Sequence, residues 1–138
     1  IHTSARSVRA LAAFLEERDI RLVFCPYEIQ MRLIARTDER VLASCFGMSP
    51  LPRYEPYDVA VLIEIARTSR PFACVFRRDF AFAAMGPLGL TRAEWEAQLR
   101  KEGIAWRTAE VEEFSVYHDL SRPPAVIRQL AAAAGRGQ

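Results

Sequence analysis

The sequence predicts an α/β fold, a three-layer Rossmann-like sandwich with a mainly parallel sheet and a C-terminal antiparallel hairpin. Three short apolar runs, at residues 20–25, 41–46 and 72–76, alternate with segments of helical periodicity. Two further runs, at 104–108 and 114–118, lie close enough in sequence to pair as a hairpin. Parallel strands joined by right-handed crossovers are the expected solution for this order of elements.

The length and composition indicate one folded domain over residues 1–138, with a core over 4–122 and a terminal helix and frayed tail over 123–138. Apolar residues make up 51% of the chain and charged residues 26%. The net charge is only +2 and the basic residues are scattered, which excludes a nucleic-acid partner. No apolar run approaches the about 20 residues that span a bilayer.

The first half of the chain reads as helix, strand, helix, strand. A helix is predicted over 4–19, with its apolar positions at three- and four-residue spacing: Val8, Leu11, Ala12 and Leu15. Pro26, directly after the strand at 20–25, suits the first helical position because it has no N–H to leave unpaired. On the helix predicted over 26–36, one side carries Tyr27, Met31 and Ile34.

The second half continues the alternation. Three prolines in residues 47–56 predict a loop, followed by a helix over 57–67. A short helical turn is predicted over 80–85. Thr91 and Glu94 form a capping-box pattern that starts a helix running to Glu102, and Gly103 supplies the left-handed residue that ends it. A terminal helix is predicted from Pro123 through Ala134.

The three cysteines lie in predicted strands and have no metal-ligand spacing. We therefore interpret Cys25, Cys45 and Cys74 as small core hydrophobes. Cys25 also precedes a helix, where a thiol can become nucleophilic, so a thiol enzyme remains an alternative. Neither histidine can be placed beside it as a base. No dinucleotide or nucleotide-triphosphate motif is present, and we predict no cofactor, no metal site and no catalytic residue.

Candidate ligand-binding residues follow the predicted parallel strands, whose carboxyl ends usually form the binding edge of an open sheet. Tyr27 and Glu28 follow the first strand, and Arg77 lies in a polar turn, Arg77-Arg78-Asp79, after the third. Between them, Arg53, Tyr54 and Tyr57 combine a guanidinium group with aromatic rings, which suits sugars or phosphates. The alternative for this segment is an aromatic-anchored loop in which Glu55 and Asp58 favour the helix start.

Several segments, taken in order, resemble the soluble C-terminal domain of bacterial membrane glycosyltransferases of the polyprenol-phosphate-sugar, mannosyltransferase-like type. The resemblance covers roughly residues 8–120, and these segments carry it: Glu17-Arg18-Asp19-Ile20, Cys25-Pro26-Tyr27, Asp38-Glu39-Arg40-Val41, Arg53-Tyr54-Glu55-Pro56-Tyr57, residues 70–76 and residues 113–117. Where that family has an aspartate-containing run after the first strand, this chain keeps Tyr27 but has Pro26 and Glu28, so no role of that aspartate is carried over.

The resemblance implies a non-catalytic, extracytoplasmic accessory or substrate-contacting domain, excised from a longer membrane protein. Its partners would be its own transmembrane portion and a sugar or lipid-linked sugar. The alternative is a free-standing, cytoplasmic α/β module that binds a small anionic or sugar ligand at the strand carboxyl ends. A homodimer is a further alternative, because Val126, Ile127 and Leu130 of the terminal helix could pack against a second copy.

Overall fold

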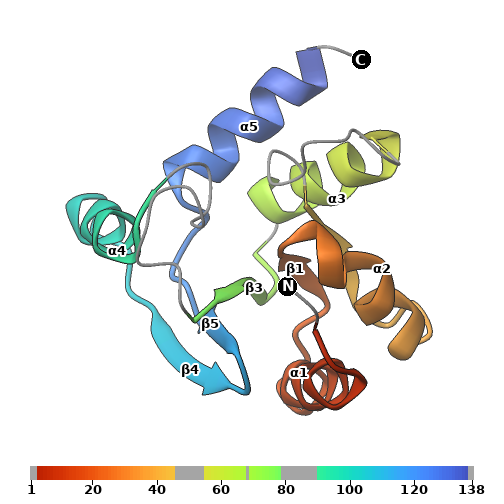
Figure 1. Cartoon of the computed structure of the whole chain (residues 1–138). Helices are drawn as coiled ribbons and strands as arrows, with labels where there is room; N and C mark the ends of the chain where they lie inside the picture. The colour runs from red at the N-terminus through yellow and green to blue at the C-terminus, as the bar shows by residue number, and fades with distance from the viewer. Residues whose placement is uncertain (1–2, 46–54, 68, 79–89, 137–138) are drawn as a thin grey trace.

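The fold is a mixed α/β domain in which helices and strands alternate along most of the chain (Figure 1). The computed structural model describes residues 3–45, 55–67, 69–78 and 90–136. Its elements are α1 (Ala5–Glu17), β1 (Leu22–Phe24), α2 (Tyr27–Arg36), β2 (Leu42–Ser44), α3 (Glu55–Arg67), β3 (Phe72–Arg77), α4 (Arg92–Lys101), β4 (Arg107–Val111), β5 (Phe114–His118) and α5 (Ala125–Arg136). The predicted α/β alternation is confirmed.

Within the described part of the chain, the sheet has five strands in the order β2-β1-β3-β5-β4. β1 pairs in parallel with β2 on one side and with β3 on the other. β5 runs antiparallel to β3, with Val75 opposite Val116, and β4 completes the antiparallel end against β5. The expected combination of a parallel core and a C-terminal antiparallel hairpin is therefore present. β1 is a central strand, because it pairs with a neighbour on each side.

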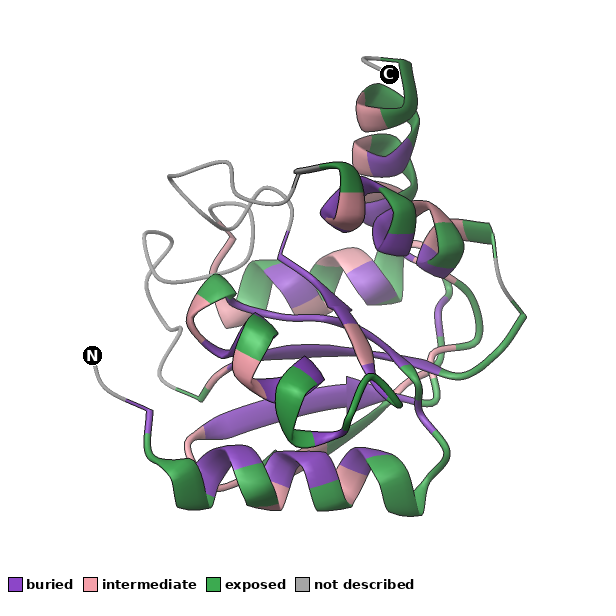
Figure 2. Ribbon diagram, turned by 90° about the vertical axis from the view of Figure 1, so that its right-hand side faces the viewer, coloured by how far each residue is buried: buried purple, intermediate pink, exposed green. Residues whose placement is uncertain are grey.

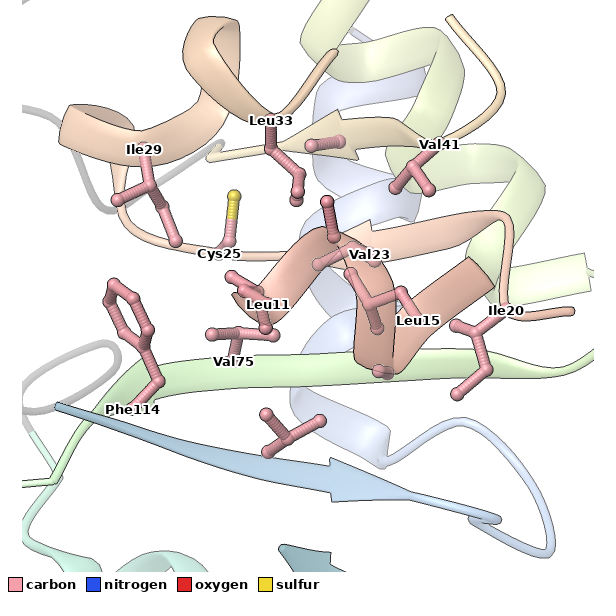
Figure 3. Close-up of a cluster of buried hydrophobic side chains, with 14 of the residues drawn as sticks. Leu11, Leu15, Ile20, Val23, Cys25, Ile29, Leu33, Val41, Val75 and Phe114 are labelled. Atoms are coloured by element: carbon pink, nitrogen blue, oxygen red, sulfur yellow. The ribbon is translucent and has the colours of Figure 1, made fainter. Parts of the chain in front are cut away.

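Two hydrophobic clusters lie on opposite faces of this sheet, because successive strand residues point to opposite sides. Val23 and Cys25 join the first cluster, with Leu11 of α1 and Leu33 of α2. Figure 3 shows this first cluster. The second cluster contains Phe24 of β1 and buried side chains of three helices: Leu62 of α3, Trp95 of α4 and Ile127 of α5. In Figure 2 the buried residues follow the strands and the inner sides of the helices.

Local backbone and side-chain contacts determine where α4 begins and where α1 and α4 end. The Thr91 hydroxyl accepts from the Glu94 N–H at 3.1 Å, and the Glu94 carboxylate accepts from the Thr91 N–H at 2.9 Å, which confirms the capping box. Gly103 follows α4 with φ 69°, in the left-handed region where L residues are strained. Asp19 holds the equivalent position after α1, with φ 54°.

The hairpin differs from the prediction, because the strand expected over 104–108 is observed over Arg107–Val111. Ile104 is buried, and its N–H donates to the Leu99 carbonyl at 3.0 Å, so it closes α4 instead of starting a strand. The turn uses Glu112, which has φ 52°, and Glu113. A two-residue turn places Val111 opposite Phe114 and sets the register of the whole hairpin.

The third helix begins earlier than expected. Glu55 and Pro56, assigned to the loop from sequence, belong to α3. A proline fits here because N–H groups in the first helical turn have no partner within the helix. Residues 47–54 of the predicted loop and the turn predicted over 80–85 lie outside the described residues. Within the described residues, no helix has the length and apolarity needed to cross a membrane.

Candidate functional site

The carboxyl ends of β1 and β2 meet a buried polar group that we call the Asp58 cluster: Gln30, Ser44, Cys45 and Asp58. The Asp58 side chain comes from α3 and is 4% exposed. Its Oδ1 accepts from Gln30 Nε2 at 2.5 Å and from the Cys45 N–H at 3.2 Å. The Asp58 carbonyl accepts from the Ser44 hydroxyl at 2.9 Å. One residue of α3 thus fastens the end of β2 to α2.

The thiols at this edge are poor nucleophiles. Cys25 is fully buried, and burial raises its pKa well above the ordinary value, with further increases from the nearby Cys45 and Glu28 charges. Burial and the Asp58 carboxylate raise the pKa of Cys45 to about 12. Since the thiolate is the reactive form, neither group is activated at neutral pH. The core interpretation of the cysteines therefore fits, and the thiol-enzyme alternative loses its nucleophile.

The predicted residues Tyr27, Glu28 and Tyr57 lie around this edge in different environments. Tyr27 opens α2 and is 45% exposed, and Met31, one turn later, is 48% exposed. These two residues share one side of α2 with Ile34, as predicted, but only Ile34 is buried. Glu28 is partly buried, and its charge reaches both Cys25 and Cys45.

Tyr57 serves the core more than a surface site. Its ring packs against both hydrophobic clusters, its hydroxyl is enclosed, and desolvation raises its pKa. Arg53 and Tyr54, the other members of the predicted aromatic segment, lie outside the described residues.

Arg77 lies at the end of β3, the strand next to β1, and contacts the N-terminal segment. Arg77 Nη1 donates to the Thr3 hydroxyl at 3.3 Å. Arg32 of α2 donates through Nη1 to the Thr3 carbonyl at 2.5 Å. Thr3 is 2% exposed, so two guanidinium groups from different elements enclose it.

Arg78, the second residue of the predicted polar turn, joins a surface network on the hairpin. Its Nε lies 3.8 Å from Glu110 Oε2, and Arg92 Nη1 lies 3.6 Å from Glu110 Oε1. The buried Ser115 hydroxyl donates to Glu110 at 2.9 Å and accepts from Arg92. Arg78 and Arg92 thus share the single negative charge of Glu110.

The opposite edge of the parallel strands also holds a small hollow of about 110 Å³. Its lining residues are Glu16, Asp19, Ile20, Arg21, Arg40 and Val41. Arg21 pairs with Asp19 at 2.9 Å and Arg40 with Glu16 at 3.2 Å. Because acidic and basic groups pair within the hollow itself, it offers little net charge to a ligand.

Sequence reasoning missed Gln30, Ser44 and Arg32, and it did not predict the inward contacts of Asp58. One interpretation of the sequence made Asp58 an aid to the helix start; in the structure its carboxylate also accepts from the Gln30 amide and the Cys45 N–H. The signal for Gln30 was present, because it occupies the same stripe of α2 as Leu33 and Ile34, where a polar residue requires a buried partner. Arg32 and Thr3 carried no comparable signal, since only the tertiary fold brings them together.

The described residues contain no group of three or more histidine, cysteine, aspartate or glutamate side chains placed to hold a metal ion. The carboxyl edge of the sheet carries the arginine donors Arg32 and Arg77 and the exposed ring of Tyr27. Such groups can bind a ligand. When the chain is compared with known proteins, no family model, no curated protein and no solved structure matches it.

Proposed function

We propose that this chain is a non-catalytic, extracytoplasmic accessory domain of a membrane glycosyltransferase-like protein, and that its sheet is the centre of a three-layer Rossmann-like sandwich. The domain is tethered through its N-terminal side to a transmembrane portion that carries the transferase chemistry, and it contacts a sugar or lipid-linked sugar. The ordered sequence segments that resemble this class of proteins support the proposal, among them the segment that forms β5.

The observation that carries the proposal is the pair of arginines around Thr3. Arg32 and Arg77 hold the N-terminal segment against the carboxyl edge of the parallel strands. Tyr27 and Glu28 follow β1 at that same edge. A tether that enters beside Thr3 therefore turns this edge, and not the amino edge, towards the membrane portion and its substrate.

The full-length protein tests this proposal. We expect it to stay in the membrane fraction after carbonate extraction, with residues 3–136 open to protease from the extracytoplasmic side. We further expect Arg77→Ala to lower sugar transfer at least several-fold, whereas Arg9→Ala, on the exposed side of α1, leaves it unchanged. A reading frame without transmembrane helices, or protease access only from the cytoplasm, would overturn the proposal.

The second candidate is a free-standing module that binds a small anionic or sugar ligand at the same edge. Two separate features of this edge favour it: the Tyr27 ring is 45% exposed, and the guanidinium groups of Arg32 and Arg77 converge on Thr3. Aromatic faces cover sugars, and arginine binds anionic oxygens. Thermal-shift measurements with sugars, sugar phosphates and nucleotides test it. A shift that is lost in Tyr27→Ala and Arg53→Ala supports the module, and no shift with any of these compounds refutes it.

A further inference from the structure

Two of the three cysteines occupy neighbouring positions on adjacent parallel strands. In the pairing of β1 with β2, Phe24 lies opposite Ser44. The Cys25 N–H continues the ladder by donating to the Ser44 carbonyl at 2.9 Å. Cys25 and Cys45 directly follow this pair of residues, so they lie side by side at the ends of the two strands. Adjacent strands are about 4.8 Å apart, which lies within the Cα separation that a disulfide bridges.

Both side chains also point to the same face of the sheet. Cys25 belongs to the first hydrophobic cluster with Ile29 and Leu33 of α2, and Figure 3 shows its sulfur on the side of that helix. The Cys45 thiol donates to Gln30 Oε1, also on α2, at 3.1 Å. The two thiols are close enough for the charge of one to raise the pKa of the other.

Cys74 provides a contrast within the same protein. It lies opposite Phe24 in the pairing of β1 with β3 and belongs to the second cluster, on the other face of the sheet. It is fully buried there among apolar groups. The sheet therefore separates Cys74 from the other two thiols.

We propose that Cys25 and Cys45 form an intramolecular disulfide when the chain folds in the presence of a disulfide oxidant, such as oxidised glutathione or a thiol–disulfide oxidoreductase, while Cys74 remains a thiol. One cysteine attacks the oxidant to give a mixed disulfide, and the second displaces it. The two cysteines together lose two electrons and two protons as their S–S bond forms. The oxidant's S–S bond breaks and takes up the electrons and protons as two thiols.

The reaction belongs to the folding chain, because the finished fold encloses both thiols. The product links the carboxyl ends of β1 and β2, next to the Asp58 cluster, and closes a loop that contains α2. The inference does not depend on the proposed membrane tether, since it is tested on this chain alone.

The test is to refold the denatured chain with oxidised and reduced glutathione, alkylate the remaining thiols under denaturing conditions and map tryptic peptides. The three cysteines fall on separate peptides, 22–32, 41–53 and 68–77, since trypsin does not cleave between Arg70 and Pro71. We expect the mass of two hydrogen atoms to be lost, one thiol to be alkylated, and peptides 22–32 and 41–53 to be joined until a reductant is added.

Two variants serve as controls. Cys74→Ala is expected to form the same link, and Cys45→Ser, which keeps a donor for Gln30, is expected to form none. We also expect oxidised wild-type protein to melt at a higher temperature than the same protein with dithiothreitol, and Cys45→Ser to show no such difference. Three alkylated thiols after refolding, glutathione adducts alone, or a link to peptide 68–77 would refute the inference.

Discussion

Among single residues, His118 couples the fold to pH. It ends β5 with only 7% of its surface exposed, and its ring meets Phe14 of α1 edge-on at 5.3 Å. Burial lowers the pKa of His118 below its ordinary value, and the charges of Arg18 and Arg107 add to the effect. Asp119, whose Oδ2 lies 3.4 Å from His118 Nδ1, offsets it only in part. Just below pH 6.5, the His118 imidazole is therefore neutral in the folded protein and protonated in the unfolded chain.

We predict that stability falls as the pH drops through the ordinary histidine pKa of 6.5. Below that value the unfolded chain binds a proton that the folded chain does not, so the free energy of unfolding decreases. Urea unfolding midpoints between about pH 8 and about pH 5.5 measure the effect. His118→Gln should show a flatter profile over this range, and an identical slope in both proteins would contradict the assignment.

At the level of elements, the ends of the helices explain which parts of the fold could be predicted. The capping box of Thr91 and Glu94 and the stop at Gly103 depend on neighbours in sequence, so both were predicted correctly. The first hairpin strand was placed too early, because Ile104 has strand character in sequence but completes the end of α4. Local patterns predict local structure, whereas competition between two elements for one residue is decided by tertiary packing.

The two described glycines allow a matched test of helix ends. Gly103 has φ 69°, so Gly103→Ala should destabilise the protein by about 1–2 kcal/mol, since an L side chain is strained there. Gly135 lies within α5, where an added Cβ meets Ile63 Cδ1 at an ordinary 3.7 Å. Gly135→Ala should therefore stabilise it by up to about 1 kcal/mol. Chemical denaturation measures both, and equal signs would contradict this explanation.

The candidate site could be predicted only in outline, because sequence patterns predict local structure and this site is built from tertiary contacts. The carboxyl edge follows from strand order, and Tyr27, Glu28 and Arg77 were placed near it from their positions after strands. The hydrogen bonds that build this edge join residues far apart in sequence. Gln30 and Asp58 are separated by 28 residues, and Thr3 and Arg77 by 74. No local pattern encodes such contacts.

At the level of the whole molecule, the Asp58 cluster joins the two faces of the sheet. Gln30 belongs to a helix that packs on the first cluster, and Asp58 to a helix that packs on the second, and they meet at the end of β2. A buried carboxylate in this position specifies how α2 and α3 sit relative to each other, because each of its donors has only a narrow range of geometry.

We predict that Asp58→Ala lowers the free energy of unfolding by about 2–3 kcal/mol, because the Cys45 N–H and the Gln30 amide lose a buried acceptor. Glu64→Ala, on the exposed side of the same helix, is the matched control and should change stability by less than about 0.5 kcal/mol. Urea denaturation followed by circular dichroism compares them. Equal midpoints for the two variants would show that the cluster contributes nothing to stability.

The outermost strands set limits on self-association. An edge strand offers unpaired backbone groups to a neighbouring chain, and natural sheets discourage this with short or charged edges. Among the residues that the structure describes, one edge of the sheet is β2, with three residues, and the other is β4, which exposes Arg107, Thr108 and Glu110. Extension of the sheet from one molecule into the next is therefore disfavoured at both ends. Any homodimer of this domain is expected to join through helix surfaces, where Tyr27 and Met31 already offer apolar side chains to solvent.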